Sequence, residues 1–546
     1  MKKTAKRITA IIISILFIFT MFPVQVFAAT ETKVLNLKCS DKNFAYEFNN
    51  LSDYARYGNK KYLIKVKPGT YHVRRGQQLR LYSNTTVDFT RVKIIHSAND
   101  NTLLRLGRRG DDWDNYNKGK GHPGYTGFKN IKIIGGTFDG GGNSQALMRF
   151  GHSSNITIEG SSFKNVKNAH MIEIGACKNF VIKKCSFSGF KGKWTVSTNY
   201  EAIQFECLTP TGNHFSAYTP NKDETPCKNC TVESCNFKNL QRGIGTHTGI
   251  VNSYFTGMKF IKNKFENITG YAISAVNYKN SKINGNTIKN CGAGIVFKTS
   301  ILDHKNFYAS KKSGNKHKKY VKMKSQINNN KITLNSYKGK YKNVAYGIQL
   351  FGEKLKKKSG SVPAGDFRCA GVTVKGNTVN LNFTGYGIWL WGAMANTVQG
   401  NTVNANIKKK ASGGNGDPIR LQGSGKNTVK GNKLYNKTKG GYASNLNGIT
   451  LYSSPSNKII SNKISKAKKD GINVGYSKGN TISGNKISGS GNNGIGLYGV
   501  KSTVITGNTV KSSKGYGIYT STAKKRAIKT ESKNKISKSG KRAKNW

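Results

Sequence analysis

The sequence predicts an all-β protein, a right-handed parallel β-helix (solenoid) with a short N-terminal capping helix. A phrase of the form apolar-x-Gly-Asn-Thr/Lys-apolar returns after 23 or 24 residues wherever no insertion intervenes, and such a period is typical of a solenoid. Each repeat contains short stretches of alternating apolar and polar residues between Gly, Asn and Ser turns, which indicates strands rather than helices. The asparagines of the phrase are Asn263, Asn286, Asn330, Asn377, Asn401, Asn432, Asn462, Asn485 and Asn508.

Equivalent residues of a solenoid lie in vertical register. Because successive coils stack at about 4.8 Å, a residue sits directly above its counterpart in the next repeat. We therefore expect the asparagines to form a hydrogen-bonded ladder. In earlier coils the same position is predicted to hold Ser162, Cys185 and Cys235. Longer intervals mark coils with inserted loops, such as the lysine-rich stretch 311–324.

The N-terminus has the pattern of an export signal. Basic residues precede an uncharged apolar run over 8–27, which ends in Ala28 and Ala29; this predicts a signal peptide over residues 1–28. An uncleaved anchor is the alternative, because roughly 20 apolar residues can span a bilayer. The small residues and the following Glu31 favour cleavage, and no later segment is apolar enough to cross a membrane. We therefore expect a secreted, extracellular protein.

The rest of the chain divides into three parts. Residues 29–60 are predicted to form an N-terminal cap, because an open solenoid end must be covered. The cap contains a helix over 43–57, and the parallel β-helix follows over 61–537. Residues 538–546 form a basic C-terminal tail. The apolar face of the capping helix is predicted to consist of Phe44, Phe48, Leu51 and Tyr54.

The charge balance favours an anionic partner. The chain holds 90 Lys and Arg against 24 Asp and Glu, a formal net charge of +66, and such a field attracts polyanions. An acidic polysaccharide or a cell-wall polyanion fits this charge. The alternative is that the lysines only solubilise exposed turns and strand edges. We expect no nucleic-acid partner, because an exported chain without a binding motif offers only its charge, and we expect a monomer.

Nine cysteines are scattered through the chain. The segment Cys227-Lys-Asn-Cys230 has the spacing of a zinc site, but Cys230 and Cys235 fall inside repeats, where they would stack as apolar residues. In an exported protein a disulfide is favoured over a metal site.

Several segments resemble a known superfamily. Lys65-Val-Lys-Pro-Gly-Thr-Tyr71, residues 79–87, Gly135-Gly-Thr-Phe-Asp-Gly140 and the repeats that follow are similar to the pectate-lyase-like right-handed β-helix proteins over residues 34–537. That superfamily includes polysaccharide lyases, pectin-degrading hydrolases, epimerases and phage tailspikes. The resemblance implies the fold, which hosts several chemistries and also non-enzymes. The paired-aspartate motifs of the pectin hydrolases are absent from the coils after Gly140, so that activity is disfavoured, and no full calcium-binding pattern of the pectate lyases matches.

The register can be used to align distant residues. The second strand of each coil begins with an inward apolar residue, and the residue after it points outward. The inward residues are Met148, Ile172, Ile203, Ile244, Ile273, Ile348, Ile388 and Ile419. The outward residues are Arg149, Glu173, Gln204, Gly245, Ser274, Gln349, Trp389 and Arg420.

Ionisable residues concentrate at one level of this alignment. The alternative is that the glutamates only pair with surface cations, but the matching positions of later coils are small or neutral, such as Thr450 and Asn473. Clustered titratable groups favour a functional site. The candidate catalytic residues are His170, Glu173, Glu201, Glu206, Arg242 and His247. The candidate substrate-binding residues are Arg149, Gln204, Gln349, Trp389, Trp391 and Arg420.

Two reactions suit this set of residues. Elimination across a uronic acid needs a group that neutralises the sugar carboxylate and a base that removes the adjacent proton. Arg242 or Arg149 could bind the carboxylate with Gln204, and His170 or His247 could be the base. Hydrolysis needs two carboxylates, which the glutamates could supply. A calcium ion held by Glu173, Glu201 and Glu206 could also replace the arginine, so we expect either no cofactor or calcium.

We therefore expect a secreted carbohydrate-active protein that cleaves an acidic polysaccharide, with β-elimination by a polysaccharide lyase favoured over hydrolysis. A glycoside hydrolase or a uronate epimerase is the enzymatic alternative. The alternative from another class is a non-catalytic protein that binds the cell wall or a glycan at the surface.

Overall fold

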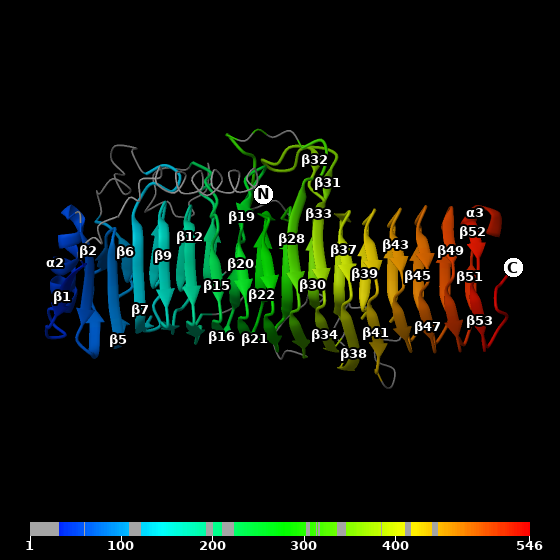
Figure 1. The fold of residues 1–546 in the computed structure, drawn as a ribbon, viewed down its shortest axis with the longest axis horizontal. Helices are drawn as coiled ribbons and strands as arrows, with labels where there is room; N and C mark the ends of the chain where they lie inside the picture. The colour runs from blue at the N-terminus through cyan, green and yellow to red at the C-terminus, as the bar shows by residue number, and fades with distance from the viewer. Residues whose placement is uncertain are drawn as a thin grey trace, which may run out of the picture.

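The computed structural model describes residues 32–58, 60–108, 122–192, 200–209, 223–301, 306–312, 314, 317–335, 345–383, 385–409, 416–438 and 446–546. These residues form one long rod of stacked coils (Figure 1). The predicted all-β solenoid is thereby confirmed. The predicted signal peptide lies outside the described residues.

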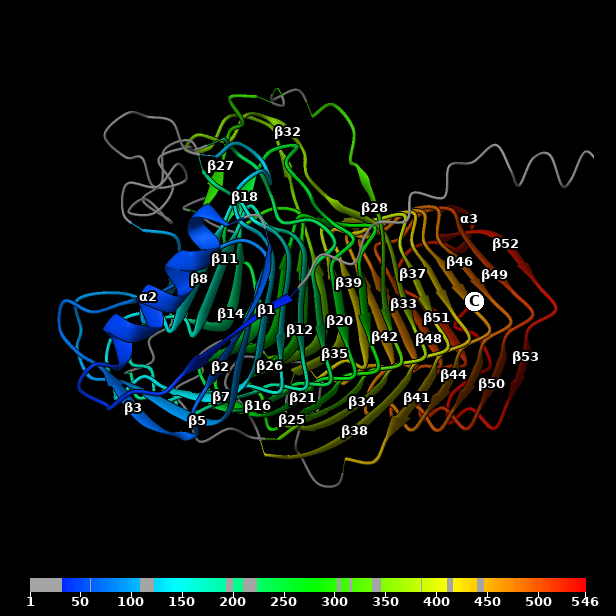
Figure 2. The same cartoon turned by 60° about the vertical axis from the view of Figure 1, so that its left-hand side comes forward.

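The rod is built from two large sheets of parallel strands, one of 32 strands and one of 15. Figure 2 shows the strands of each sheet following one another along the rod. The 15-stranded sheet carries the candidate site. Its strands, in spatial order, are β4 (Leu79–Leu81), β6 (Leu104–Leu106), β8 (Met148–Gly151), β11 (Ile172–Gly175), β14 (Glu201–Glu206), β17 (Arg242–Gly245), β22 (Tyr271–Val276), β26 (Ala293–Lys298), β30 (Ala345–Phe351), β35 (Gly385–Trp391), β39 (Ile419–Gln422), β42 (Ile449–Tyr452), β45 (Ile472–Gly475), β48 (Ile495–Tyr498) and β51 (Ile518–Thr520).

The predicted register of this sheet is confirmed. Ile172 pairs with Met148 on one side and with Ile203 on the other, and Ile203 pairs with Ile244. All of these inward residues are buried. The coils at Ile273 and Ile348 are not adjacent, because β26 places Ile295 between them.

The interior is filled by stacked aromatic rings and by the asparagine ladder. Ring centroids lie 4.7 to 5.2 Å apart along a run of phenylalanines. These are Phe138, Phe163, Phe187, Phe237 and Phe265. Each asparagine from Asn263 to Asn508 that the sequence placed in the ladder donates from Nδ2 to Oδ1 of the next, as from Asn377 to Asn401 at 2.9 Å. The predicted ladder therefore forms.

One residue of the predicted ladder is wrong by one position. Ser162 of β10 (Ser162–Lys164) pairs with Ser186 of β13 (Ser186–Ser188), so Cys185 lies level with Ser161. Ser161 is 1% exposed. From there the ladder continues as predicted, since the Cys185 amide donates to Cys235 Sγ at 3.4 Å and the Cys235 amide to Asn263 Oδ1 at 3.0 Å.

The capping helix is α2 (Phe44–Tyr57). Phe44 and Phe48 are fully buried and stack on Tyr71 and Phe89 of the first coils. The predicted position of Tyr54 on the buried face is wrong, because its ring is 54% exposed. At the opposite end of the rod lie α3 (Lys524–Ala527) and the last strand, β53 (Lys535–Ser537). No helix among the described residues is both long and apolar enough to cross a membrane.

The expected disulfide is absent. All nine cysteines fall within the described residues and all are free. Cys227 and Cys230 are both fully buried, and burial raises the pKa of the Cys227 thiol well above its usual value. These residues therefore serve the core as small apolar side chains.

Candidate active site

The candidate site lies on the outer face of the 15-stranded sheet, over strands β8, β11, β14 and β17. Arg149, Glu173, Gln204 and Gly245 follow one another in register, as predicted. Two residues before the inward residue is a position that we call the turn-entry position, and there Glu201 and Arg242 are in register as the first residues of β14 and β17. His170 precedes β11 by the same two residues by which Glu201 precedes Ile203. Three neighbouring coils thus supply the site.

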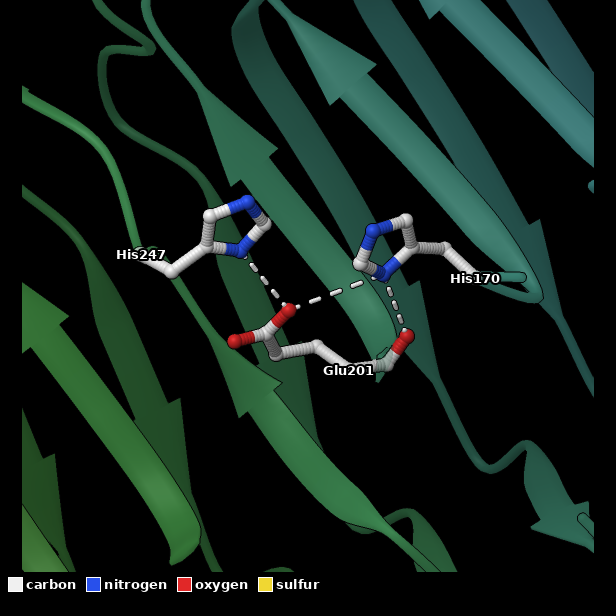
Figure 3. A group of neighbouring side chains, drawn as sticks. All are labelled: His170, Glu201 and His247. Atoms are coloured by element: carbon white, nitrogen blue, oxygen red, sulfur yellow. Dashed lines mark hydrogen bonds and ion pairs between the residues drawn. The ribbon is translucent and has the colours of Figure 1, made fainter. Parts of the chain in front are cut away.

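Glu201 is the centre of the cluster (Figure 3). His247 Nδ1 lies 3.0 Å from Glu201 Oε2, and Arg242 donates from Nη1 to Oε1 at 3.1 Å. His170 Nδ1 lies 3.6 Å from Oε2 and donates to the Glu201 main-chain oxygen at 2.9 Å. Because a carbonyl only accepts, His170 carries its proton on Nδ1. In Figure 3 the second ring nitrogen of each histidine lies on the side away from Glu201.

The two imidazoles are close but electrostatically different. Their ring centroids are 5.8 Å apart with an angle of 16° between the planes. Burial lowers the pKa of His170, and the nearby glutamates only partly offset it. Burial also disfavours the charged form of His247, but its contact with Glu201 outweighs burial and raises the His247 pKa. At neutral pH, His170 is therefore neutral and can accept a proton, whereas His247 is the more readily protonated of the two histidines.

The carboxylate of Glu201 is anionic. Burial would raise its pKa, but His247, Arg242 and His170 together hold that pKa well below the usual range. The side chains of His170 and His247 are 11% and 10% exposed, and that of Glu201 is fully buried. The two histidines, and Arg242 with a side chain that is 10% exposed, therefore present an edge to the surface, and Glu201 orients them from the buried side.

The other two glutamates have different roles. Glu173 forms an ion pair with Arg149, which is one coil away, and despite burial this pair lowers the pKa of Glu173. Glu206 is fully buried, and neither of its oxygens makes a hydrogen bond of normal geometry with the described residues. Burial raises the pKa of Glu206 to about 7. Glu206 therefore adds a titratable charge beneath His247 and does not reach the surface.

The expected calcium ligands are not assembled. Within the described part of the chain, the only three metal-ligating side chains whose donor atoms lie within 4.8 Å of one another are those of His170, Glu201 and His247. Calcium prefers oxygen ligands, and here Arg242 already neutralises the single carboxylate at 3.1 Å. The residues therefore do not fit calcium.

Tyr271, which the sequence analysis missed, extends the site along the rod. The Arg242 guanidinium lies 4.9 Å from its ring centroid, and Lys298 Nζ lies 5.3 Å from it. Burial disfavours the phenolate, but these two cations and a hydrogen bond with Tyr346 lower the pKa of Tyr271. Its signal in the sequence was its place two residues before the inward Ile273, the place of Glu201 and Arg242 in their own coils.

The predicted substrate-binding residues fall into two groups. Arg149 and Gln204 adjoin the cluster through the register. Gln349, Trp389 and Arg420 are in register with one another on β30, β35 and β39, and are separated from β14 by β17, β22 and β26. In this second group the Trp389 and Trp391 rings stack at 5.1 Å, while Arg420 pairs with the buried Asp417 at 3.2 Å.

The turn-entry position changes character along the rod. In the later coils it holds Asp417, Asn447, Asp470 and Asn493. These four residues form a ladder, because the main-chain amide of each one donates to the side-chain oxygen of the one before it at 3.0 to 3.1 Å. In the coils of the candidate site the same position holds His170, Glu201, Arg242 and Tyr271. The first group forms a ladder with main-chain amides, whereas His170 and Arg242 of the second group both contact the Glu201 carboxylate. This departure from the repeat sets the candidate site apart.

Comparisons with known proteins place the fold in a family. Residues 224–403 and 404–534 match the family described as the right handed beta helix region. A segment of 169 residues is 27% identical to the plasmin and fibronectin-binding protein A of Streptococcus pneumoniae and covers 29% of this chain and 22% of that protein.

Two kinds of solved structure are also similar. The Streptococcus pneumoniae surface protein and adhesin PfbA gives a TM-score of 0.45 at 16% identity, over 89% of this chain and 100% of that chain. The tailspike of Escherichia coli bacteriophage HK620, in complex with a pentasaccharide, gives 0.44 at 14% identity, over 92% and 76%. The family match covers more than half of the sequence, and the chain therefore belongs to the right-handed β-helix proteins.

Proposed function

We propose that the protein is exported and cleaves an acidic polysaccharide by β-elimination. The observation that carries this proposal is the pair of imidazoles bridged by Glu201, with the pKa of His170 lowered and that of His247 raised. Two titratable groups whose environments separate their pKa values are suited to act as base and acid.

His170 is the proposed base. Its proton lies on Nδ1, where it is held by the Glu201 carbonyl oxygen at 2.9 Å, so the lone pair is on Nε2. In the reaction Nε2 takes the proton from the carbon next to the uronate carboxylate. The electron pair of that bond forms a carbon–carbon double bond, and the bond to the glycosidic oxygen breaks.

His247 is the proposed acid. The Glu201 carboxylate at 3.0 Å stabilises its imidazolium form, which can donate a proton to the departing oxygen. Arg149 lies one coil before His170, Arg242 lies in the coil of His247, and the two supply positive charge for the sugar carboxylate. The products are one chain with an unsaturated end and one with a new hydroxyl group.

Hydrolysis is less well supported. It requires a protonated carboxylic acid that reaches the glycosidic oxygen. The pKa of Glu201 and of Glu173 is lowered by ion pairs, and Glu206, whose pKa is raised, has both oxygens buried. A uronate epimerase would use the same base but would leave the chain length unchanged.

The test is incubation of the purified protein with a panel of uronate polymers. Ultraviolet absorbance of an unsaturated product is followed beside reducing ends. We expect both to rise together, and His170→Ala to abolish both while the circular dichroism spectrum stays unchanged. Reducing ends without absorbance would indicate hydrolysis instead.

Non-catalytic binding at a cell surface is the second candidate. The observation that favours it is the 27% identity over 169 residues to a protein named for binding plasmin and fibronectin. The same panel separates the two, because retention of a polymer without any product would support this candidate.

A further inference from the structure

Tyr476 has a backbone conformation that its side chain disfavours. Its φ is 48°, in the left-handed region. The residues at the same place in neighbouring coils are Gly423, Ser453 and Gly499, with φ of 56°, 48° and 62°. The main-chain amides of Gly423, Ser453 and Tyr476 each donate to a carbonyl oxygen of the next coil. A left-handed conformation is costly for a bulky side chain, and the three neighbouring coils meet it with glycine or serine. The tyrosine therefore brings no evident advantage to the coil.

Among the residues that the structure describes, the Tyr476 side chain is also the most exposed large hydrophobic group, at 70%. Tyr452 of the preceding coil is 45% exposed, and the two ring centroids lie 5.7 Å apart at 80°. Each ring lies above the glycine of the following coil. A Cβ on Gly475 would come within 3.6 Å of Tyr452 Cδ2, and one on Gly499 within 3.2 Å of Tyr476 Cδ1.

Two lysines follow the position of Tyr476 by two residues, one in its own coil and one in the next. Lys478 and Lys501 form a parallel bridge between successive coils, and both are exposed. Neither forms an ion pair among the residues that the structure describes. The acidic residues after position 403 are Asp417, Asp470 and Glu531; the two aspartates are buried, and Glu531 pairs with Lys544 at 3.0 Å.

We propose that Tyr452, Tyr476, Lys478 and Lys501 form a second glycan-binding surface, which we call the tyrosine surface. Aromatic rings stack on the apolar faces of sugar rings, and the two ammonium groups attract carboxylates. The ligand class is therefore an acidic polysaccharide. This surface lies eight strands from β14 in the 15-stranded sheet, about 38 Å along the rod at the spacing of stacked strands.

The surface shares only its ligand class with the proposed function, and it takes no part in the reaction. A polymer that reaches from one to the other would be bound at both. Short oligosaccharides at the histidines would not touch the tyrosine surface.

The test compares Tyr476→Gly with Tyr46→Ala, whose tyrosine is 67% exposed on the capping helix. Affinity for polygalacturonate and for alginate is measured by titration calorimetry in the His170→Ala background, so that no polymer is shortened. We expect Tyr476→Gly to weaken binding about tenfold, as for the loss of about 1.4 kcal/mol. We also expect its urea midpoint to be equal to or higher than that of the parent, because glycine relieves the left-handed strain. Tyr46→Ala should bind like the parent.

Three results would overturn the proposal: unchanged affinity in Tyr476→Gly, a lowered urea midpoint in that variant, or no binding of the parent to either polymer. Lys478→Ala with Lys501→Ala is the second variant. It should weaken binding and reduce its salt dependence. Because these readouts are binding and stability, they are independent of whether the histidines turn over substrate.

Discussion

His247 Nδ1 and Glu201 Oε2 lie 3.0 Å apart on adjacent coils of the rod, and the same carboxylate holds Arg242 at 3.1 Å through its other oxygen. One buried anion therefore orients a histidine and an arginine that each lie more than 40 residues after it in the chain.

Glu201→Gln should abolish the proton donor while keeping the shape of the side chain. Without the anion, burial would lower the pKa of His247, and the loss of a positioned acid costs about 100- to 10,000-fold in rate. The variant also leaves Arg242 with an unpaired buried charge, at a cost of about 3–5 kcal/mol in the free energy of unfolding. Turnover and urea unfolding measure the two effects. Wild-type turnover in this variant would contradict the assignment of Glu201.

The rate of the wild-type protein should have a bell-shaped dependence on pH. Below the lowered pKa of His170 the base is protonated, and above the raised pKa of His247 the acid is lost. The pKa of an unperturbed histidine is about 6.5. The rate should therefore be highest around that pH, and it should fall on the acidic side as His170 is protonated and on the alkaline side as His247 loses its proton. His170→Ala should remove most activity at every pH. A rate that rises steadily to pH 9 would instead point to a base of higher pKa, such as Tyr271.

Glu206→Gln should stabilise the protein at alkaline pH. The folded-state pKa of Glu206 is raised to about 7, so the carboxyl group favours folding below its unfolded pKa and loses that contribution as the pH rises through 7. The neutral amide avoids the loss. We expect a gain of up to about 3 kcal/mol at pH 8 and none at pH 4. Urea unfolding at both values measures it, and an equal gain at both would mean that packing rather than charge is responsible.

Chelation of divalent ions should leave turnover intact. The carboxylates of Glu173 and Glu201 are held by Arg149 and Arg242, which already provide the positive charge that calcium would bring. The measurement is initial rate with and without EDTA, and after readdition of calcium. Loss of activity in EDTA that calcium restores would show that these ion pairs open to bind the metal.

The repeat made most of the register predictable. Because every coil carries an apolar residue at the same inward position, Glu173 could be placed beside Arg149 and Gln204 without coordinates. The contacts between side chains were harder to predict. The register brings Glu201 near Arg242, but it does not reveal that His247 and His170 turn toward the same carboxylate. Positions that deviate from the repeat were misplaced or missed.

Two such deviations have clear physical reasons. Ser162 was assigned in place of Ser161 because that coil lacks the asparagine that marks the ladder. In the capping helix, Ser52 and Ala55 are buried instead of Tyr54, because small residues let the helix approach the first coil closely. The Tyr54 ring turns outward, where Lys33 lies 5.0 Å from its centroid.

The ladder of asparagines gives the rod a modular length. Since Asn401 and its equivalents make the same bonds to the coil above and the coil below, insertion or loss of one whole repeat leaves every remaining contact of the ladder intact. Each such event would move the exposed tyrosines relative to the histidines by one step of about 4.8 Å. Gain or loss of whole repeats can therefore change the distance between the two sites in fixed increments, without any change in the residues of either site.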